Sequence, residues 1–283
     1  MTTPPLAPPL VDAAWLRTAL GRTGLVVLDV RSPADGPTIP EAVHADYAKA
    51  GWRATVNGMP GFLPEVPVLE ALIGGLGIGN PDHVVVVSSG ANAADMGNAT
   101  RVYWTFKALG HDAVSVLDGG MAAWTADPSN PVGLEPATLP PKLFKASPRP
   151  ELRATLAEVE KAVAAGTVPL VDSRSAEQFA GKAKSPTARA AGTLPGAVHI
   201  DNASFYSAAD KRFVTPETVR TLASQAGATQ DAPIAFCNTG HLASVAWFAM
   251  SELAGIPGVR LYDGSMTEWT ADPSRPLKNG EGA

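Results

Sequence analysis

A chain of 283 residues, of which 45% are hydrophobic and 17% charged, has the composition of a soluble globular protein and can form two domains of ordinary size. Its net charge of −5 provides no basic surface for nucleic acid or acidic membrane, and no apolar stretch approaches the roughly 20 residues of a membrane span. The single cysteine excludes an internal disulfide and a cysteine-rich metal site. We therefore expect no metal, no organic cofactor, and neither a nucleic-acid nor a membrane partner.

The first ten residues contain prolines at four positions and lack both a charged start and a long apolar run. A signal peptide is therefore not visible, and we expect a disordered arm at this end. Cytoplasm is the expected compartment, with periplasm as the alternative if a leader has been removed.

Short β-branched runs alternate with helical patterns along the first half. Strands are expected at residues 25–28, 84–87 and 114–117, and a helix is expected to begin at Asp12. Near-continuous apolar runs of this length are typical of strands buried on both faces. They predict a mostly parallel sheet with helices on both sides.

The second half shows the same alternation. Strands are expected at residues 170–171, 234–236 and 259–261. Helices are expected to begin at Thr155, which has a capping-box spacing, and at Thr215, which is followed by a proline.

The two halves repeat one another. An Asp-x-Arg motif at Asp29 recurs at Asp172, and residues 114–129 recur as residues 259–274. The repeat is far longer than the 20–50 residues of solenoid units, so we expect two tandem α/β domains. Residues 127–150 contain seven prolines and predict an extended, semi-rigid linker. The predicted boundaries are residues 1–130 for the first domain, 131–150 for the linker and 151–283 for the second domain.

Cys237 stands between an apolar strand-like run and an apolar helix-like run, with Gly240 in the short loop that joins them. Functional sites of open α/β sheets lie beyond the carboxyl ends of strands. Backbone N–H groups and a helix dipole favour a thiolate at such a turn. The alternative interpretation is a buried cysteine that acts only as a small hydrophobic residue.

Four motifs together resemble the two-domain rhodanese family, the thiosulfate and 3-mercaptopyruvate sulfurtransferases. They are Asp-x-Arg, Gly-Thr-Leu-Pro-Gly-Ala-Val-His, the strand that ends in Cys237, and Tyr-Asp-Gly-Ser-Met-x-Glu-Trp, within residues 10–275. The resemblance implies a catalytic second domain and a degenerate first domain. Ser88 aligns with Cys237, and the segment from Ser88 to Trp104 is longer than the one that follows the cysteine. The first copy is therefore expected to lack both nucleophile and cradle.

In such a sulfurtransferase the Cys237 thiolate would accept a sulfur atom as a persulfide and pass it to a thiophilic acceptor. An anionic persulfide gains from N–H and hydroxyl donors, which the following loop offers. His241 could be a donor or a pH-dependent charge, or simply face solvent. The candidate cradle residues are Asn238, Thr239, Gly240, His241, Leu242, Ala243 and Ser244.

Loop chemistry separates the related activities. A cysteine phosphatase needs arginine six positions after the cysteine, where this chain has Ala243. Thiosulfate enzymes typically carry cationic side chains in the cysteine loop, where this chain offers only His241. Mercaptopyruvate enzymes typically have glycine where this chain has Asn238, whereas Thr239 and Gly240 fit their pattern. They also tend to have arginine where this chain has Gln178 and histidine where it has Thr38. We therefore expect thiosulfate as the donor, with 3-mercaptopyruvate as the alternative. A non-turnover persulfide carrier or sensor that serves a partner protein is the rival class.

The positive charge that an anionic donor requires is expected upstream of the cysteine. Candidate substrate-binding residues are Lys182, Lys184, Arg189 and Arg174. The first three could equally form a solvated basic loop. Arg174 is expected mainly to make a buried structural ion pair with Asp172. Asp263 and Ser265, in the turn after the last strand, are candidate residues at the rim of the site. Because the equivalent turn recurs in the first copy, a structural role is expected for them as well.

Overall fold

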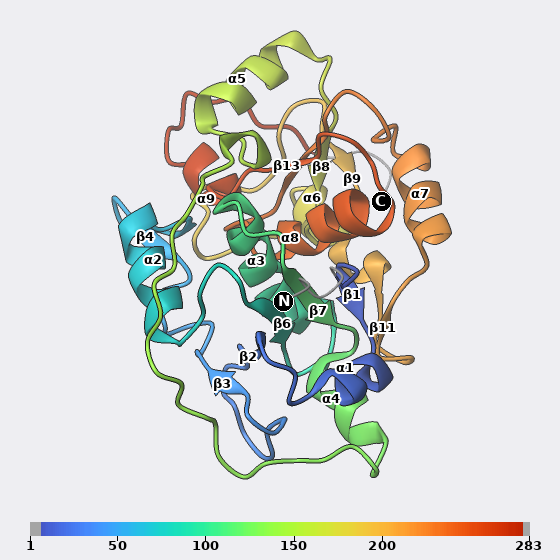
Figure 1. The fold of residues 1–283 in the computed structure, drawn as a ribbon. Coiled ribbons are helices and arrows are strands. Elements are labelled where there is room, and N and C mark those ends of the chain that lie inside the picture. Colours follow the sequence, from blue (N-terminus) through green and yellow to red (C-terminus); the bar gives the residue numbers. More distant parts are fainter. Residues whose placement is uncertain (1–6, 280–283) are drawn as a thin grey trace. The chain divides into compact units, whose positions relative to one another are not determined.

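The computed structural model describes residues 7–279 and divides the chain into two compact units. Each unit contains one parallel sheet flanked by helices (Figure 1). The predicted fold class, two tandem α/β domains with mostly parallel sheets, is confirmed. The first unit comprises the chain up to Trp52, Pro64–Pro148 and Ala208–Arg212, and the second comprises Arg53–Leu63, Arg149–Ser207 and the chain from Phe213 onward.

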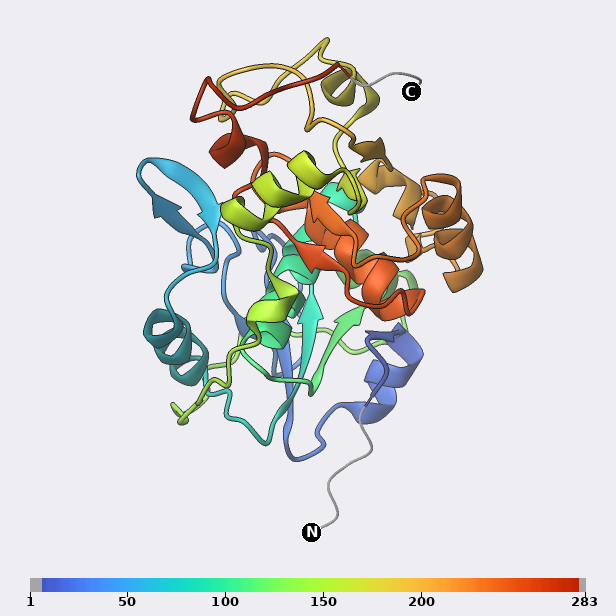
Figure 2. The same ribbon diagram turned by 90° about the horizontal axis from the view of Figure 1, so that it is seen from above.

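The sheet of the first unit has the strand order β1-β7-β6-β2-β3. The strands β6 and β7 lie side by side at its centre (Figure 2). Valines 84–87 of β6 are at most 1% exposed, as expected for a strand covered on both faces. The strands are Leu10–Val11 (β1), Leu25–Asp29 (β2), Val43–His44 (β3), His83–Val87 (β6) and Val114–Leu117 (β7).

Four helices flank this sheet. The first begins where the sequence predicts, because the Asp12 carboxylate accepts a hydrogen bond from the backbone N–H of Trp15 and caps the helix. The helices are Ala13–Ala19 (α1), Val66–Gly75 (α2), Ala93–Ala108 (α3) and Gly120–Ala126 (α4).

The predicted N-terminal arm is wrong for its last residues. Leu10 and Val11 form β1, which pairs in parallel with β7, and the carbonyl oxygen of Pro9 accepts the N–H of Val116. An available sheet edge overrides the low strand propensity of a proline-rich segment. Residues 1–6 of the predicted arm lie outside the described residues.

The second unit repeats four of these five strands as β13-β12-β8-β9, and an isolated bridge between Arg153 and Leu261 takes the place of the edge strand β1. Its helices begin at the predicted caps: Thr155 makes a complete capping box with Glu158, and Thr215 caps the helix that starts at Pro216. The strands are Leu170–Asp172 (β8), Val198–His199 (β9), Ile234–Phe236 (β12) and Arg260–Leu261 (β13). The helices are Leu156–Ala165 (α5), Ala176–Phe179 (α6), Pro216–Gln225 (α7), Leu242–Trp247 (α8), continued as a π-helix over Phe248–Leu253, and Ser265–Trp269 (α9), with 3-10 turns at Pro150–Leu152 and Asn202–Phe205.

Each repeat contributes a hairpin segment to the other unit. The hairpin of Ala54–Val56 (β4) and Met59–Phe62 (β5), drawn in blue in Figure 2, is part of the second unit. In the second repeat, β10 (Tyr206–Ser207) pairs with β11 (Arg212–Phe213). Residues 208–212, which run from the end of β10 to the first residue of β11, are part of the first unit. The predicted boundaries follow the repeats, whereas the compact units differ from them at these two segments and at the predicted linker, most of which belongs to the first unit.

The proline-rich segment lies along the first unit as a strap. Thr38 and Gly133 form a backbone bridge, Val43 pairs with Ala137, and Phe144 is buried at 2% exposure. The compact unit extends to Pro148, so this segment is attached over most of its length. Among the helices of residues 7–279, none combines the length and the apolar character that crossing a bilayer requires.

Candidate active site

Cys237 directly follows β12, the strand that lies between β8 and β13 in the second sheet. Gly240 adopts a φ of 69°, a left-handed conformation that glycine adopts without strain, and α8 begins at Leu242. The cysteine is only 1% exposed. The chain therefore makes the strand–loop–helix turn that the sequence indicates, with the thiol at its base.

Ser265 lies beneath this loop rather than on its rim. Its Oγ accepts hydrogen bonds from the N–H groups of Cys237 at 3.0 Å and Gly240 at 3.1 Å. The same hydroxyl donates to the carbonyl oxygen of Tyr262 at 2.7 Å. Ser265 is fully buried and has a φ of 49°, which is strained for a non-glycine residue. One hydroxyl thus fixes both ends of the tight turn at the nucleophile.

Some hydrogen-bond donors of the predicted cradle already have an acceptor within the protein, and others do not. The Ser244 hydroxyl donates to the carbonyl oxygen of His241 at 2.7 Å, so it stabilises the loop. Within residues 7–279, no acceptor is found for the backbone N–H groups of four loop residues. Free N–H groups beside a thiol are what an anionic sulfur species requires. These four residues are Asn238, Thr239, Leu242 and Ala243.

The hairpin β4–β5 packs against the cysteine loop. A Cβ on Gly61 would lie 2.5 Å from the carbonyl oxygen of Thr239, so only glycine fits there. Just beyond the hairpin, the N–H of Leu63 donates to the Asp263 carboxylate at 2.7 Å, and the same carboxylate pairs with Arg153 at 2.9 Å. A segment of the first repeat therefore holds both the cysteine loop and the turn that carries Ser265.

Sequence reasoning missed this hairpin, although a signal was present. The dipeptide Asn57-Gly58 joins β4 to β5, and both residues have positive φ. Asn-Gly between two short strands is a strong hairpin signal. Its position beside Cys237 could not have been read from local sequence.

The predicted structural ion pairs are confirmed. Arg174 pairs with Asp172 at 2.5 Å with both side chains fully buried, and Arg31 pairs with Asp29 at 2.7 Å in the first copy. Because Arg174 is inaccessible, it can act on a substrate only through its neighbours.

The basic segment is anchored to α9. The hydroxyls of Thr187 and Thr267 lie 2.8 Å apart, and the N–H of Thr267 donates to the carbonyl oxygen of Asn238. The segment is thus connected to the cysteine loop through one helix. The side chains of its three cations, Lys182, Lys184 and Arg189, are exposed.

Burial biases a carboxyl beside this turn toward its neutral form. Burial raises the pKa of Glu268, and the Asp263 carboxylate raises it further, although the neighbouring Tyr262 hydroxyl acts in the opposite direction. Burial also raises the pKa of the Tyr262 hydroxyl. Both shifts disfavour the charged forms of these side chains in the turn beneath the cysteine.

The loop of the first copy has the same length, which corrects the sequence-based comparison. Helix α3 begins at Ala93, five positions after Ser88, and α8 begins at Leu242, five positions after Cys237. The tryptophans chosen for the comparison lie at different depths in their helices, so they overstated the difference.

The first-copy loop instead binds a carboxylate of its own. The N–H groups of Gly90 and Ala91 donate to Asp95 Oδ2 at 2.5 and 3.2 Å. Asp95 lies seven positions after Ser88, as Ser244 does after Cys237. The first copy therefore lacks the nucleophile, and its loop donors are already occupied by an internal anion.

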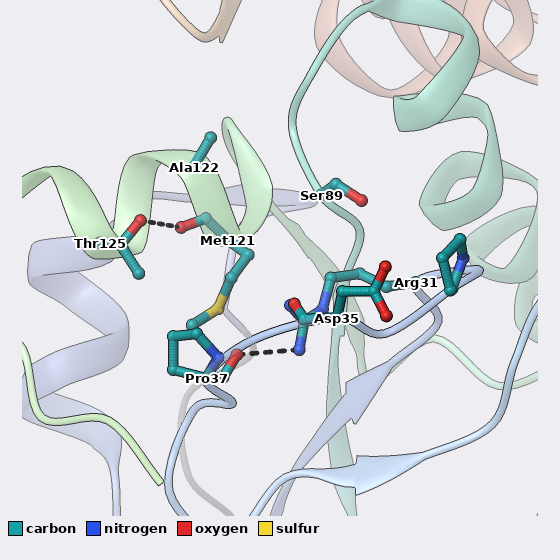
Figure 3. Close-up of a pocket in the computed structure, with 8 residues that line it drawn as sticks. Arg31, Asp35, Pro37, Ser89, Met121, Ala122 and Thr125 are labelled. Atoms are coloured by element: carbon teal, nitrogen blue, oxygen red, sulfur yellow. Dashed lines mark hydrogen bonds between the residues drawn. The ribbon is translucent and has the colours of Figure 1, made fainter. Parts of the chain in front are cut away.

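Next to this loop the first unit contains an open pocket of about 570 Å³ (Figure 3). Arg31, Ser89 and Met121 line it, and Arg31 donates to the carbonyl oxygen of Pro37. In the repeat, Ser89 and Met121 correspond to Asn238 and Met266. The pocket thus marks, in the first copy, the region that lies beside Cys237 in the second.

Comparison with known proteins agrees with this geometry. The model of the rhodanese-like domain matches residues 12–127 and again residues 155–272. The chain belongs to the rhodanese family. The chain shares the sulfurtransferase function of this family. The two matched domains coincide with the two repeats found in the sequence.

Relatives of the rhodanese family cover nearly the whole chain. A protein of Saccharopolyspora erythraea, provisionally named thiosulfate sulfurtransferase, is 32% identical over 95% of this chain and 96% of its own. The 3-mercaptopyruvate sulfurtransferase of Homo sapiens is 31% identical over 96% of this chain and 89% of its own. The structure of Tum1 from Saccharomyces cerevisiae superposes with a TM-score of 0.80 at 21% identity, covering 98% of this chain and 100% of Tum1. These relatives differ in the donor that their names give.

Proposed function

We propose that this protein transfers sulfane sulfur from thiosulfate to a thiophilic acceptor through a persulfide on Cys237. The single observation that carries the proposal is the contrast between the two loops. The second loop has a cysteine and free N–H groups, whereas the first has a serine and donors occupied by Asp95. The same fold in the same chain thus differs at the atoms that the reaction needs.

The reaction proceeds in two displacements. The Cys237 thiolate attacks the outer sulfur of thiosulfate, the sulfur–sulfur bond of the donor breaks, and sulfite leaves with its electron pair. The terminal sulfur of the persulfide is then attacked by an acceptor such as cyanide, which departs as thiocyanate and regenerates the thiolate. The free N–H groups of the loop stabilise the anionic persulfide between the two steps.

Thiosulfate is favoured because the cationic groups lie in an exposed segment outside the loop, where a small dianion can meet them. Lys182, Lys184 and Arg189 supply this charge, and His241 adds to it when protonated. 3-Mercaptopyruvate is the second candidate, supported by the 31% identity to the human enzyme of that name. Cytoplasm stays the expected compartment.

The test is thiocyanate formation from cyanide with each donor, using the wild type and Cys237→Ser. We expect turnover with thiosulfate to exceed turnover with 3-mercaptopyruvate, and Cys237→Ser to abolish both. Turnover that survives Cys237→Ser would refute the mechanism. A persulfide mass increment on Cys237 without turnover on either donor would favour a carrier that delivers sulfur to a partner protein.

The basic segment has its own test. Replacing Lys182, Lys184 and Arg189 together with alanine should raise the KM for thiosulfate several-fold while kcat changes little, because exposed charges act mainly on anion approach. Added salt should weaken the wild type in the same direction. An unchanged KM would remove these residues from the site.

A further inference from the structure

The residue after the nucleophile is bound through its side chain to another element of the second unit. Asn238 Nδ2 donates to Gln178 Oε1 at 2.9 Å, which joins the cysteine loop to α6. Both groups are uncharged amides. This bond therefore fixes the loop without adding charge beside the thiol.

Two complementary buried atoms lie at the same strand ends. Arg174 Nη1 and Asn238 Oδ1 are buried, and neither has a hydrogen-bond partner within residues 7–279. The parallel register pairs Phe236 with Asp172, so Asn238 and Arg174 each stand two positions beyond that pair on adjacent strands. One atom is a donor and the other an acceptor, and buried polar atoms rarely stay unpaired.

In the first copy, the arginine that corresponds to Arg174 is Arg31. Arg31 Nη1 donates to the carbonyl oxygen of Asp35 at 2.9 Å, and its remaining nitrogens bind Asp29 and Pro37. That guanidinium is fully used within its own loop. In the active copy the corresponding segment forms α6, and one nitrogen of Arg174 is left for the neighbouring strand end.

We propose that Asn238 is a positioning residue of the nucleophile loop, held by Gln178 on one side and by Arg174, through a bridging water, on the other. Ser265 already fixes Cys237 and Gly240, so the remaining freedom of the turn lies at the two residues between them. Fixing Asn238 keeps its backbone N–H directed for an anionic sulfur. This inference rests on the proposed role of Cys237.

Because Cys237 is the only cysteine, its alkylation by iodoacetamide reports loop geometry without any sulfur donor. Asn238→Ala and Gln178→Ala should each slow alkylation near neutral pH by about fivefold, the effect of one net hydrogen bond. The double variant should be no slower than Asn238→Ala, because that single change already removes the bond to Gln178. Gln178→Glu keeps the acceptor oxygen and should restore most of the rate at high pH.

Glu177→Ala is the matched control, since Glu177 neighbours Gln178 on α6 and is exposed. It should leave alkylation unchanged. Unchanged rates in both single variants, or effects that multiply in the double variant, would overturn the proposal. If the wild type alkylates normally but forms no thiocyanate, the proposed function fails, whereas the alkylation rates of the variants still decide whether Asn238 and Gln178 position the loop.

The link to Arg174 is tested by placing a carboxylate at either of two adjacent positions. Asn238→Asp offers its charge to Arg174 Nη1, whereas Thr239→Asp does not. The thermal midpoint should therefore fall several degrees less for Asn238→Asp than for Thr239→Asp. Equal losses at the two positions would overturn the contact with Arg174.

Discussion

The two loops that follow the central strands, one in each repeat, begin with the same geometry and differ in what occupies them. Both run five residues from the strand end to a helix. In the first, the Asp95 carboxylate accepts the loop N–H groups. In the second, Ser244 bonds within the loop, and several N–H groups stay free. The two copies therefore differ in what occupies the loop as well as in the residue at the strand end.

The two copies also differ in the residue that lies beneath the loop. Ser265 and Gly120 are equivalent, with φ values of 49° and 53°. A Cβ on Gly120 would overlap the carbonyl oxygen of Ser88, so that loop lies directly on the helix start. In the active copy the hydroxyl of Ser265 lies between the two. The side chain at this position thus decides how the loop is supported.

The largest expected effect comes from building a thiol into the inactive loop. In a Cys237→Ser background, Ser88→Cys should alkylate about 100-fold more slowly than native Cys237, because a nearby carboxylate raises a thiol pKa by up to about two units. Adding Asp95→Ser should recover much of the difference. Measured alkylation rates decide this, and fast alkylation of the Cys237→Ser, Ser88→Cys variant with Asp95 intact would show that Asp95 does not block the loop.

The next effect concerns the hairpin at the cysteine loop. Gly61→Ala forces a Cβ against Thr239 and should lower kcat by roughly 10- to 100-fold, since small displacements of reacting groups are costly. Gly119→Ala makes a comparable clash with Lys211 in the first unit. It should lower the thermal midpoint while Cys237 keeps its reactivity. Equal losses of kcat in the two variants would mean that Gly61→Ala acts through general destabilisation and not through the cysteine loop.

A smaller effect should follow from changing the support beneath the loop. Ser265→Gly gives the active copy the residue of the inactive one, relieving the strained φ but removing the acceptor of two N–H groups. We expect kcat to fall about tenfold, as for the loss of one or two buried hydrogen bonds. Steady-state kinetics beside a thermal melt provide the measurement. Undiminished kcat would mean that the backbone alone fixes the turn.

The smallest effect is a pH dependence that belongs to the first unit. Burial lowers the pKa of His83 to about 4, from the ordinary value of 6.5. Between these values the unfolded chain binds the proton and the folded chain does not, so stability falls as the pH drops from 6.5 toward 4. His83→Gln should reduce the acid-induced fall of the thermal midpoint by a few degrees. An identical fall in both proteins would contradict this assignment.

Sequence by itself determined the duplication, the mostly parallel sheets and the helix caps, and it identified Cys237 as the candidate nucleophile. These features follow from local patterns: apolar runs, capping residues such as Thr155, and Asp-x-Arg repeated at a constant spacing. The buried Asp172–Arg174 pair was predictable for the same reason, since it recurs in both copies.

Only the tertiary structure decided what surrounds Cys237. Gly61, Ser265 and Gln178 lie 176, 28 and 59 positions from the cysteine in sequence, and each meets its loop through packing of separate elements. The hydrogen bonds from the loop N–H groups to Asp95 could not be predicted from the sequence either. An aspartate in the first turn of a helix is ordinarily interpreted as a residue that stabilises the helix start. Local sequence sets which backbone a residue adopts, while the partners of that backbone are chosen by long-range contacts that no local pattern encodes.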